Sequence, residues 1–324
     1  MKSRKILNIY KFFFLIRFVE ERIAKEYTKW KMRCPTHLSV GQEMVSASIS
    51  QIFSKSDNAV SSHRSHAHYI GKGGSLRALL CELYGKKNGC SNGLGGSMHL
   101  IDLKCNFQGS TAIVGNSIPV GVGQALAAKI FDHKNLSLIF FGDAGIETGV
   151  FYESVNFSIL HNLPCIYICE NNFYSVYTGL TSRQLTKPTI SKRVEGLGIK
   201  SLRIDSSNWL KVFKTLVFAK KYVKTKKKPI FLEFLTYRKY EHVGPFLDDN
   251  LGYRPKKEIL RWHRKDPLKK IKKYIINRKI CSGANISKIE KNILNKINKD
   301  FLFAQNSKSP NKSDYKKYLF KKIL

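Results

Sequence analysis

The most informative segment of this chain is residues 137–172, SLIFFGDAGIETGVFYESVNFSILHNLPCIYICENN. Two short apolar runs within it, SLIFF and PCIYIC, are rich in strand-forming residues and predict buried parallel strands. Between them, Phe151, Val155 and Ile159 repeat at helical spacing, which predicts an amphipathic helix over 147–162. The stretch therefore predicts a strand–helix–strand unit of a parallel sheet.

Polar residues follow both predicted strands at their carboxyl ends. Asp143 comes just after the first strand and Asn172 closes the second, and open α/β sheets bind ligands at that edge. Carboxylate and amide oxygens are hard donors, which suit Mg²⁺ or Ca²⁺ held together with a diphosphate. Gly142, Ala144 and Gly145 are small enough for backbone N–H groups to approach a phosphate where the helix begins. Taken alone, the pattern is equally consistent with a structural unit that has a glycine turn and an Asn cap.

The rest of the chain continues the alternation of helices and strands. Helices are predicted over 5–31, 38–53, 75–85, 113–131 and 207–224, strands over 200–205 and 229–238, and loops over 62–73 and 89–97. The remainder is Lys-rich helix, with an apolar stripe formed by Ile286, Ile289, Ile293 and Ile297. The alternation predicts an α/β fold, a doubly wound parallel sheet flanked by helices. We divide the chain into a domain over 1–265 and a helical C-terminal extension over 266–324.

Basic residues greatly outnumber acidic ones. The 324 residues include 57 Lys and Arg against 23 Asp and Glu, a net charge of +34, and half of this excess lies in 253–324. Such a charge raises nucleic acid or an anionic membrane as a partner. The lysines are scattered over predicted helix surfaces and no nucleic-acid motif accompanies them, so we favour compositional drift toward Lys, Asn and Ile.

The cysteines and the N-terminal apolar run bear on cellular location. The chain has seven cysteines, an odd count with no CxxC pair, which is typical of reduced thiols in a cytoplasmic protein. The run FFFLI at 12–16 is too short to span a bilayer, and charges follow it at Arg17, Glu20 and Glu21. We expect an amphipathic helix there and no membrane anchor.

The interval from Asp143 to Asn172 resembles the thiamine-diphosphate signature, and further segments resemble one branch of its users. These segments are PTHLSVGQE (35–43), SHRSHAHYIGKG (62–73), GCSNGLGGSMHL (89–100), AIVGNSIPVGVG (112–123) and TYRKYEH (236–242). Over roughly residues 5–265 the chain is similar to the α subunit of the heteromeric thiamine-dependent 2-oxo-acid dehydrogenases of the pyruvate, branched-chain and acetoin types. Five ordered matches are far more specific than one Gly-Asp signature. The resemblance implies the thiamine-diphosphate-binding fold, decarboxylation of a 2-oxo acid or cleavage of acetoin, and transfer of the acyl group to a lipoyl domain.

The resemblance also implies a cofactor site. It assigns the metal, Mg²⁺, to the side chains of Asp143 and Asn172 and the backbone carbonyl of Tyr174. It assigns the diphosphate to His63, Arg64, Ala144, Gly145 and Arg238. It assigns the aminopyrimidine ring to the backbone of Ala112 and Val114. The family usually has Gly then Ala where this chain has Ala144 then Gly145, which would weaken cofactor binding if Ala144 needed a positive φ.

Three histidines match family positions that face the thiazolium ring and the substrate: His37, His66 and His242. A carbanion intermediate needs positioned donors and a proton shuttle, and histidine titrates in the right range. A zinc site formed by His63, His66 and His68 is the other interpretation, which we disfavour because the segment offers no cysteine and no fourth ligand.

Two features leave questions open. The loop 236–254 departs from the family at Tyr240, Glu241 and Val243, so the substrate class is undecided. The family's catalytic glutamate, which faces the pyrimidine, belongs to a β subunit, and this chain has no second α/β domain to supply it. We therefore expect half an active site, completed in an α₂β₂ heterotetramer. We carry three hypotheses: this α subunit with a lipoyl acyltransferase partner, a thiamine-dependent aldehyde-transfer enzyme of sugar or secondary metabolism, and a non-catalytic basic nucleic-acid-binding protein.

Overall fold

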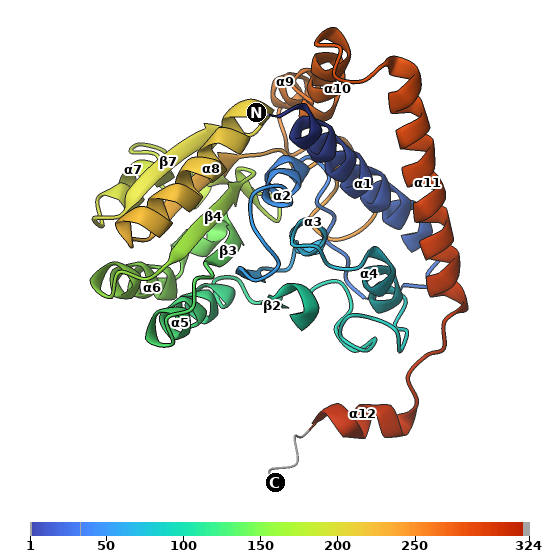
Figure 1. Ribbon diagram of the computed structural model, residues 1–324, viewed down its shortest axis with the longest axis horizontal. Helices are drawn as coiled ribbons and strands as arrows, with labels where there is room; N and C mark the ends of the chain where they lie inside the picture. The colour runs from blue at the N-terminus through green and yellow to red at the C-terminus, as the bar shows by residue number, and fades with distance from the viewer. Residues whose placement is uncertain (1, 33, 320–324) are drawn as a thin grey trace.

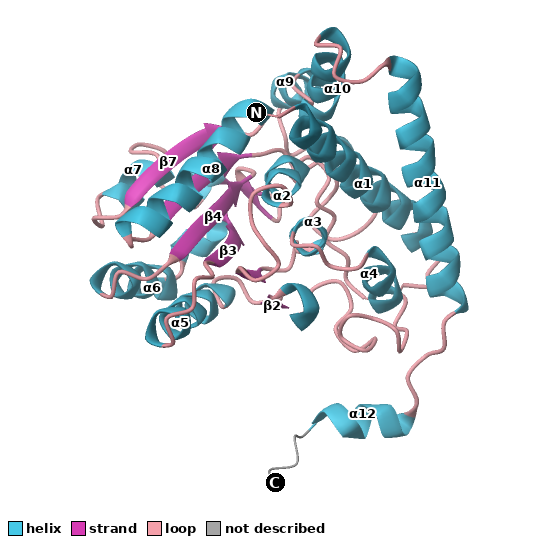
Figure 2. Ribbon diagram, viewed as in Figure 1, coloured by secondary structure: helices cyan, strands magenta, loops and turns pink. Residues whose placement is uncertain are grey.

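The computed structural model describes residues 2–32 and 34–319 and has one six-stranded, wholly parallel sheet (Figures 1 and 2). Its strand order is β2-β1-β3-β4-β8-β7, with bounds β1 (Asn58–Ser61), β2 (Phe107–Ser110), β3 (Ser137–Gly142), β4 (Cys165–Asn171), β7 (Lys200–Asp205) and β8 (Ile230–Leu235). A small antiparallel hairpin is formed by β5 (Tyr174–Ser175) and β6 (Thr178–Gly179). The predicted α/β fold with a parallel sheet flanked by helices is confirmed.

Helices cover both faces of the sheet (Figure 2). They are α1 (Ser3–Tyr27), α2 (Glu43–Ile49), α3 (His66–Gly71), α4 (Leu76–Leu83), α5 (Ser117–Ile130), α6 (Gly149–Leu160), α7 (Ile190–Glu195), α8 (Trp209–Lys226), α9 (Lys256–Arg264), α10 (Pro267–Asn277), α11 (Gly283–Asn306) and α12 (Lys312–Leu319). Short 3₁₀ turns lie at η1 (Leu103–Cys105), η2 (Asp143–Glu147), η3 (Leu180–Ser182) and η4 (Asp248–Asn250).

Alternate residues of the central strands pack into two separate hydrophobic cores. Leu138 and Phe140 of β3 belong to the larger core, which includes residues of α1, α2 and α8, whereas Ile139 and Phe141 belong to a smaller core with α5, α6 and α7. This alternation follows from the two-residue period of a strand. Both faces of the strand are buried, which explains why SLIFF is a continuous apolar run.

The C-terminal helices continue the larger core. Ile286 and Ile297 of α11 are fully buried, and Ile293 packs against the same cluster from a partly buried position. The helix lies along α1 and α4 (Figure 1). The isoleucine stripe that the sequence shows is therefore the surface by which the Lys-rich segment joins the body of the protein.

Some predicted elements differ from the observed ones. The helix predicted over 38–53 is only α2, and the loop predicted over 62–73 contains α3, so His66 and His68 lie on a helix. The edge-side strands β1 and β2 were not predicted, because NAVS and FQGS are short and partly polar and carry no clear alternation. All seven cysteines are unpaired, as expected. No helix in the described ranges is long and apolar enough to cross a membrane.

Helix α5 approaches the sheet through a glycine, which gives a stability prediction. A Cβ on Gly121 would lie 2.5 Å from Ile139 Cγ1 and 2.7 Å from Val60 Cγ2, whereas a Cβ on Gly123 would meet nothing within 4 Å. We expect Gly121→Ala to lower the free energy of unfolding by about 1–2 kcal/mol, the overpacking outweighing the better helix propensity of alanine. Gly123→Ala, the matched control, should stabilise the chain by up to about 1 kcal/mol. Urea unfolding midpoints measure both, and equal effects of the two substitutions would contradict the close packing.

Candidate active site

A cavity at the carboxyl edge of the sheet gathers nearly all the residues that the sequence singled out. They reach it from the ends of β3, β4 and β8 and from the loops before α2, α3 and α5. The predicted residues that line it are His37, His63, Arg64, Ala112, Val114, Asp143, Ala144, Gly145, Asn172, Tyr174, Arg238 and His242. His66 does not line it.

Asp143 anchors the acidic end of the cavity. Its side chain is 2% exposed and forms an ion pair with Arg183, with 2.5 Å between Oδ2 and Nη2. Arg183 also pairs with Glu147, and Gln184 Nε2 donates to the backbone carbonyl of Asp143 at 3.1 Å. Burial raises the pKa of Asp143, while Arg183 opposes that rise. A guanidinium thus neutralises the carboxylate that the sequence assigns to a metal ion. Arg183 has no local signal in the sequence, because it reaches Asp143 only through the folding of the segment that follows η3.

The neighbouring backbone allows a phosphate to approach. Ala144 is absent from the residues with positive φ, so the Ala-Gly order that departs from the family costs no backbone strain. Asn172 lies just beyond β4, and its Oδ1 accepts from the N–H of Tyr174 at 3.1 Å. The Tyr174 hydroxyl donates to Glu258 at 2.9 Å, which fixes the segment that leaves Asn172. Asp143, Asn172 and Tyr174 all line the same cavity.

Two buried arginines form the basic wall. Arg238 is 1% exposed; its Nη2 donates to Val176 O at 2.7 Å and contacts Asp248, while its Nη1 has no hydrogen-bond partner in the described chain. Arg64 donates to Leu38 O at 2.6 Å. Burial and the nearby Arg238 lower the pKa of Arg64. An unsatisfied guanidinium N–H facing a cavity suits a bound anion such as a diphosphate.

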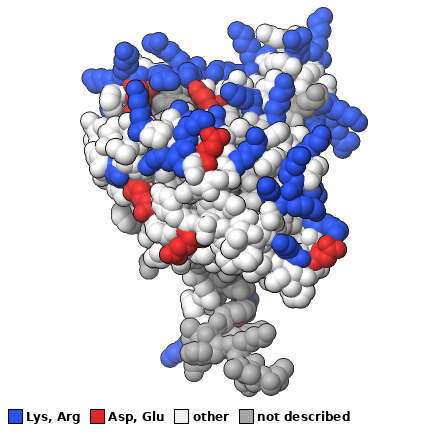
Figure 3. Space-filling view, turned by 90° about the vertical axis from the view of Figure 1, so that its left-hand side faces the viewer, with Lys and Arg blue, Asp and Glu red and all other residues white. Residues whose placement is uncertain are grey.

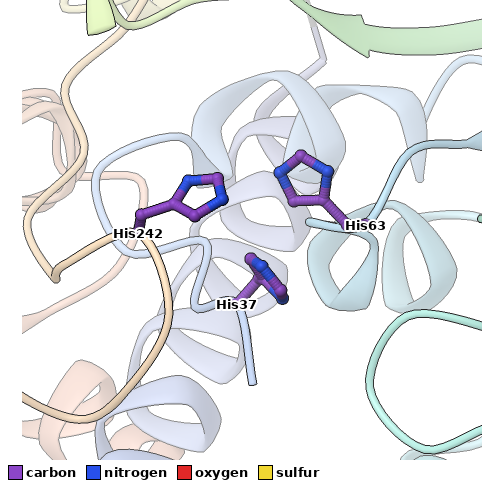
Figure 4. Close-up of side chains that lie close together, drawn as sticks. All are labelled: His37, His63 and His242. Atoms are coloured by element: carbon purple, nitrogen blue, oxygen red, sulfur yellow. The ribbon is translucent and has the colours of Figure 1, made fainter. Parts of the chain in front are cut away.

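His37, His63 and His242 form a cluster beside the arginines, each from a different loop (Figure 4). The ring centroids lie 4.6 Å apart for His37 and His63, 5.0 Å for His37 and His242, and 5.2 Å for His63 and His242. Burial, and secondarily Arg64, lowers the pKa of His63 and of His242 to about 3 and the pKa of His37 below that. All three rings are consequently neutral at pH 7.

His66 lies behind this cluster, fully buried. Its Nδ1 is 3.0 Å from Glu20 Oε1 and its Nε2 is 2.8 Å from Ser97 Oγ, which also accepts from the backbone N–H of His37 at 3.3 Å. The structure therefore gives His66 contacts that position the His37 loop, and no contact with the cavity. The expectation that His66 faces the substrate followed from its place in a matching segment, which does not show which side of a helix turns inward.

Sequence reasoning missed a second carboxylate in the cavity wall. Glu170 Oε2 accepts from Gln42 Nε2 at 2.9 Å, and its Oε1 lies 3.3 Å from His68 Nε2. Glu170 is opposite Gly142 in the register of β3 and β4. Its position at the end of a strand, directly before Asn171, was a signal that could have found it.

A second missed residue orders the glycine-rich loop 89–97. The buried carboxylate of Glu82 accepts from the backbone N–H groups of Ser91, Gly93, Gly95 and Gly96 at 2.7–3.1 Å. These bonds fix the loop that carries Ser97 and, next to it, Met98, which lines the cavity. The conformation of the loop therefore depends on the single carboxylate of Glu82.

The chain is similar to known proteins over nearly its whole length. The family model described as "Dehydrogenase E1 component" matches residues 11–313. The chain belongs to the dehydrogenase E1 component family. It is 33% identical over 312 residues to the pyruvate dehydrogenase E1 component subunit alpha of Rickettsia bellii, covering 96% of this chain and 94% of the relative. It is 32% identical over 328 residues to the same-named protein of Porphyra purpurea, covering 99% and 94%. It is 33% identical over 321 residues to the chloroplastic subunit alpha-3 of Arabidopsis thaliana, covering 97% and 74%.

Family membership selects among the three hypotheses. The chain is an α subunit of the thiamine-diphosphate-dependent 2-oxo-acid dehydrogenases, as the sequence motifs predict, and its cofactor is thiamine diphosphate. An α subunit works in a complex with a β subunit. The aldehyde-transfer and nucleic-acid hypotheses gain no support from the comparison.

The neutral histidines give a pH prediction for stability. Their pKa values, about 3 for His63 and His242, lie below the unfolded value of about 6.5, so the stability linked to them is present above pH 6.5 and falls as the pH drops toward 3. We expect the urea midpoint of the metal-free chain to fall between pH 7.5 and pH 5.5. His63→Gln should make that fall smaller, whereas His133→Gln, at an exposed position, should not change it. Equal falls in all three proteins would show that His63 titrates normally.

Proposed function

We propose that this chain, paired with a β subunit, decarboxylates pyruvate and passes the acetyl group to a lipoyl acyltransferase. The observation that carries the proposal is the convergence of Asp143, Asn172, two buried arginines and a histidine cluster on one cavity of a chain in the E1 family. The relatives compared above are all named pyruvate dehydrogenase subunits, which supports pyruvate over other 2-oxo acids.

Within this proposal a carboxylate oxygen of Asp143, the Oδ1 atom of Asn172 and the carbonyl oxygen of Tyr174 would hold Mg²⁺. This set provides three oxygens, and Mg²⁺ takes its other ligands from phosphate oxygens and water. Arg183 now pairs with Asp143, so the guanidinium must move aside when the ion binds. The backbone N–H groups of Ala144 and Gly145, where η2 begins, would bind the diphosphate, and Arg64 and Arg238 would neutralise its charge.

Thiamine diphosphate, when bound, supplies the carbon nucleophile and the electron sink that allow the bond to the substrate carboxylate to break. The chain's own contribution is binding and proton handling. His37 and His242 are neutral at pH 7, so each ring can donate through one nitrogen and accept through the other. His37 Nδ1 is buried and has no partner in the described chain, and we assign it to hydrogen-bond a substrate oxygen.

Two observations support completion of the site by a partner. The cavity encloses about 170 Å³, less than the 300–1,000 Å³ or so typical of a ligand pocket. Helices α5 and α6 also leave apolar side chains exposed, among them Val120, Ile130, Phe157 and Leu160. Helices α5–α8 lie on the left-hand side of Figure 1, and Figure 3 shows this face from the front. Its upper part is crowded with Lys and Arg, whereas its lower middle is largely free of charged residues. We propose that the β subunit covers this region in an α₂β₂ heterotetramer and contributes the glutamate for the pyrimidine.

The metal assignment predicts the effect of removing one carboxylate. Asp143→Ala should weaken binding of thiamine diphosphate with Mg²⁺ by more than about 100-fold, because the ion loses its only charged protein ligand. Asp132→Ala, with a side chain 89% exposed, is the matched control and should bind normally. Titration calorimetry on the complex with the β subunit measures both. Unchanged affinity of the Asp143→Ala variant would contradict the assignment of the metal ion to this position.

The half-site proposal predicts dependence on the partner. The purified chain alone should not decarboxylate pyruvate, and addition of the β subunit should restore turnover of about 1 s⁻¹ or more. Acetyl transfer should then require a lipoyl domain. Turnover at that rate by the chain alone would contradict the half-site, and turnover restored only with another 2-oxo acid would contradict the choice of pyruvate.

A further inference from the structure

The histidine cluster of the cavity has the composition of a metal-binding site distinct from that of Asp143 and Asn172. The ring nitrogens of His37, His63 and His242 that serve as ligand atoms all lie within 4.8 Å of one another. The three rings come from the loop before α2, the loop after β1 and the loop after β8, and Figure 4 shows them turned toward a common space. Residues so far apart in the sequence meet here only through the fold.

These ring nitrogens are not committed to other groups. His37 is 4% exposed, and its buried Nδ1 has no hydrogen-bond partner. Within the described chain, the rings of His63 and His242 also make no hydrogen bond to protein atoms; only the backbone carbonyl of His242 is engaged, by Arg64 at 3.3 Å. His66 contrasts with them, since both of its nitrogens are held by Glu20 and Ser97. An uncompensated buried imidazole nitrogen indicates a missing partner.

We propose that His37, His63 and His242 bind one Zn²⁺ ion through three imidazole nitrogens, with the fourth position open to the cavity. Three histidines and an open position form a well-known zinc geometry, with Zn–N distances of about 2.0–2.1 Å and hence nitrogens ~3.3 Å apart. The side chains would have to rotate to bring the nitrogens from their present separation of up to 4.8 Å to that value. Imidazole favours Zn²⁺ over Mg²⁺, whereas the oxygen donors of Asp143 and Asn172 have the reverse preference, so the two sites select different ions.

The surrounding charge determines the fourth ligand. Arg64 and Arg238 lie beside the cluster and disfavour a dication, so the bound ion takes an anion at its open position: hydroxide or the carboxylate of a 2-oxo acid. His63 completes the site, because without it only the rings of His37 and His242 remain as ligands. If the proposed function holds, Zn²⁺ occupies the substrate end of the cavity and inhibits the enzyme in competition with the 2-oxo acid.

The experiment uses Co²⁺ alone as a spectroscopic substitute for Zn²⁺, on the full chain co-purified with its β subunit and freed of metal and cofactor. We expect one equivalent of Co²⁺ per α chain to give the intense visible absorption of four-coordinate cobalt, and Zn²⁺ to abolish it by displacement. His63→Tyr and His242→Asn should each weaken Co²⁺ binding by about 100-fold or more. The exposed His133→Tyr should leave it unchanged, and thermal unfolding identifies any variant that fails to fold.

Further variants distinguish this site from the proposed cofactor site. Asp143→Ala should keep the cobalt band, because it removes an oxygen donor from the other site only. A band that persists in both histidine variants, or that disappears in Asp143→Ala, overturns the proposal, as does the absence of any band in the unsubstituted complex. Because no cofactor or substrate is present, these results do not depend on whether the chain decarboxylates pyruvate.

Discussion

The register of three adjacent parallel strands determines where the chemistry of this protein can occur. Gly142 at the end of β3 lies opposite Glu170 in β4, and Asn171 at the end of β4 lies opposite Leu235 at the end of β8. The residues that follow each strand therefore leave the sheet at one edge. A shift of one residue in any pairing would turn the alternating side chains to the wrong face and separate Asp143 from Asn172. Burial of both strand faces between two helix layers makes such a shift costly.

Buried charge is the second feature on which the site depends. Most buried ions in the described chain are paired: Asp248 with Arg238 and Arg254, Glu43 with Arg17, and Asp143 with Arg183. Against this background the unsatisfied polar atoms in the cavity are informative, because a buried donor without a partner costs about 1–3 kcal/mol. Arg238 Nη1 and His37 Nδ1 are such atoms. The rest of the fold offsets that cost, and a bound anion or metal ion would remove it by giving these atoms a partner.

Much of this architecture could be predicted from local pattern. The apolar runs at β3, β4 and β8 and the periodic helices follow from residue type and spacing, because both faces of the sheet are buried. The resemblance of five segments then placed all but one of the site residues in the cavity. Strands β1 and β2 escaped prediction because they are four residues each and carry serine, asparagine and glutamine. Their strand structure depends on neighbours and not on their own sequence.

The site residues that sequence analysis placed wrongly or missed are those set by tertiary contacts. His66 sits in a matching segment, but the turn of α3 directs it to Glu20 and Ser97. Arg183 reaches Asp143 from a loop 40 residues away in the chain. The meeting of His63 with His37 and His242 likewise depends on three loops. None of these contacts has a local signature, since each is fixed by how separate segments pack.

We propose that one cavity at the carboxyl edge holds the diphosphate half of thiamine diphosphate and that a partner holds the rest. The most direct measurement is an experimental structure of the α–β complex with thiamine diphosphate and Mg²⁺. We predict Mg²⁺ about 2.0–2.1 Å from oxygens of Asp143 and Asn172, Arg183 displaced from Asp143, and the pyrimidine against a glutamate of the β subunit. A diphosphate bound elsewhere, or a cofactor enclosed by this chain alone, would contradict this division of the site.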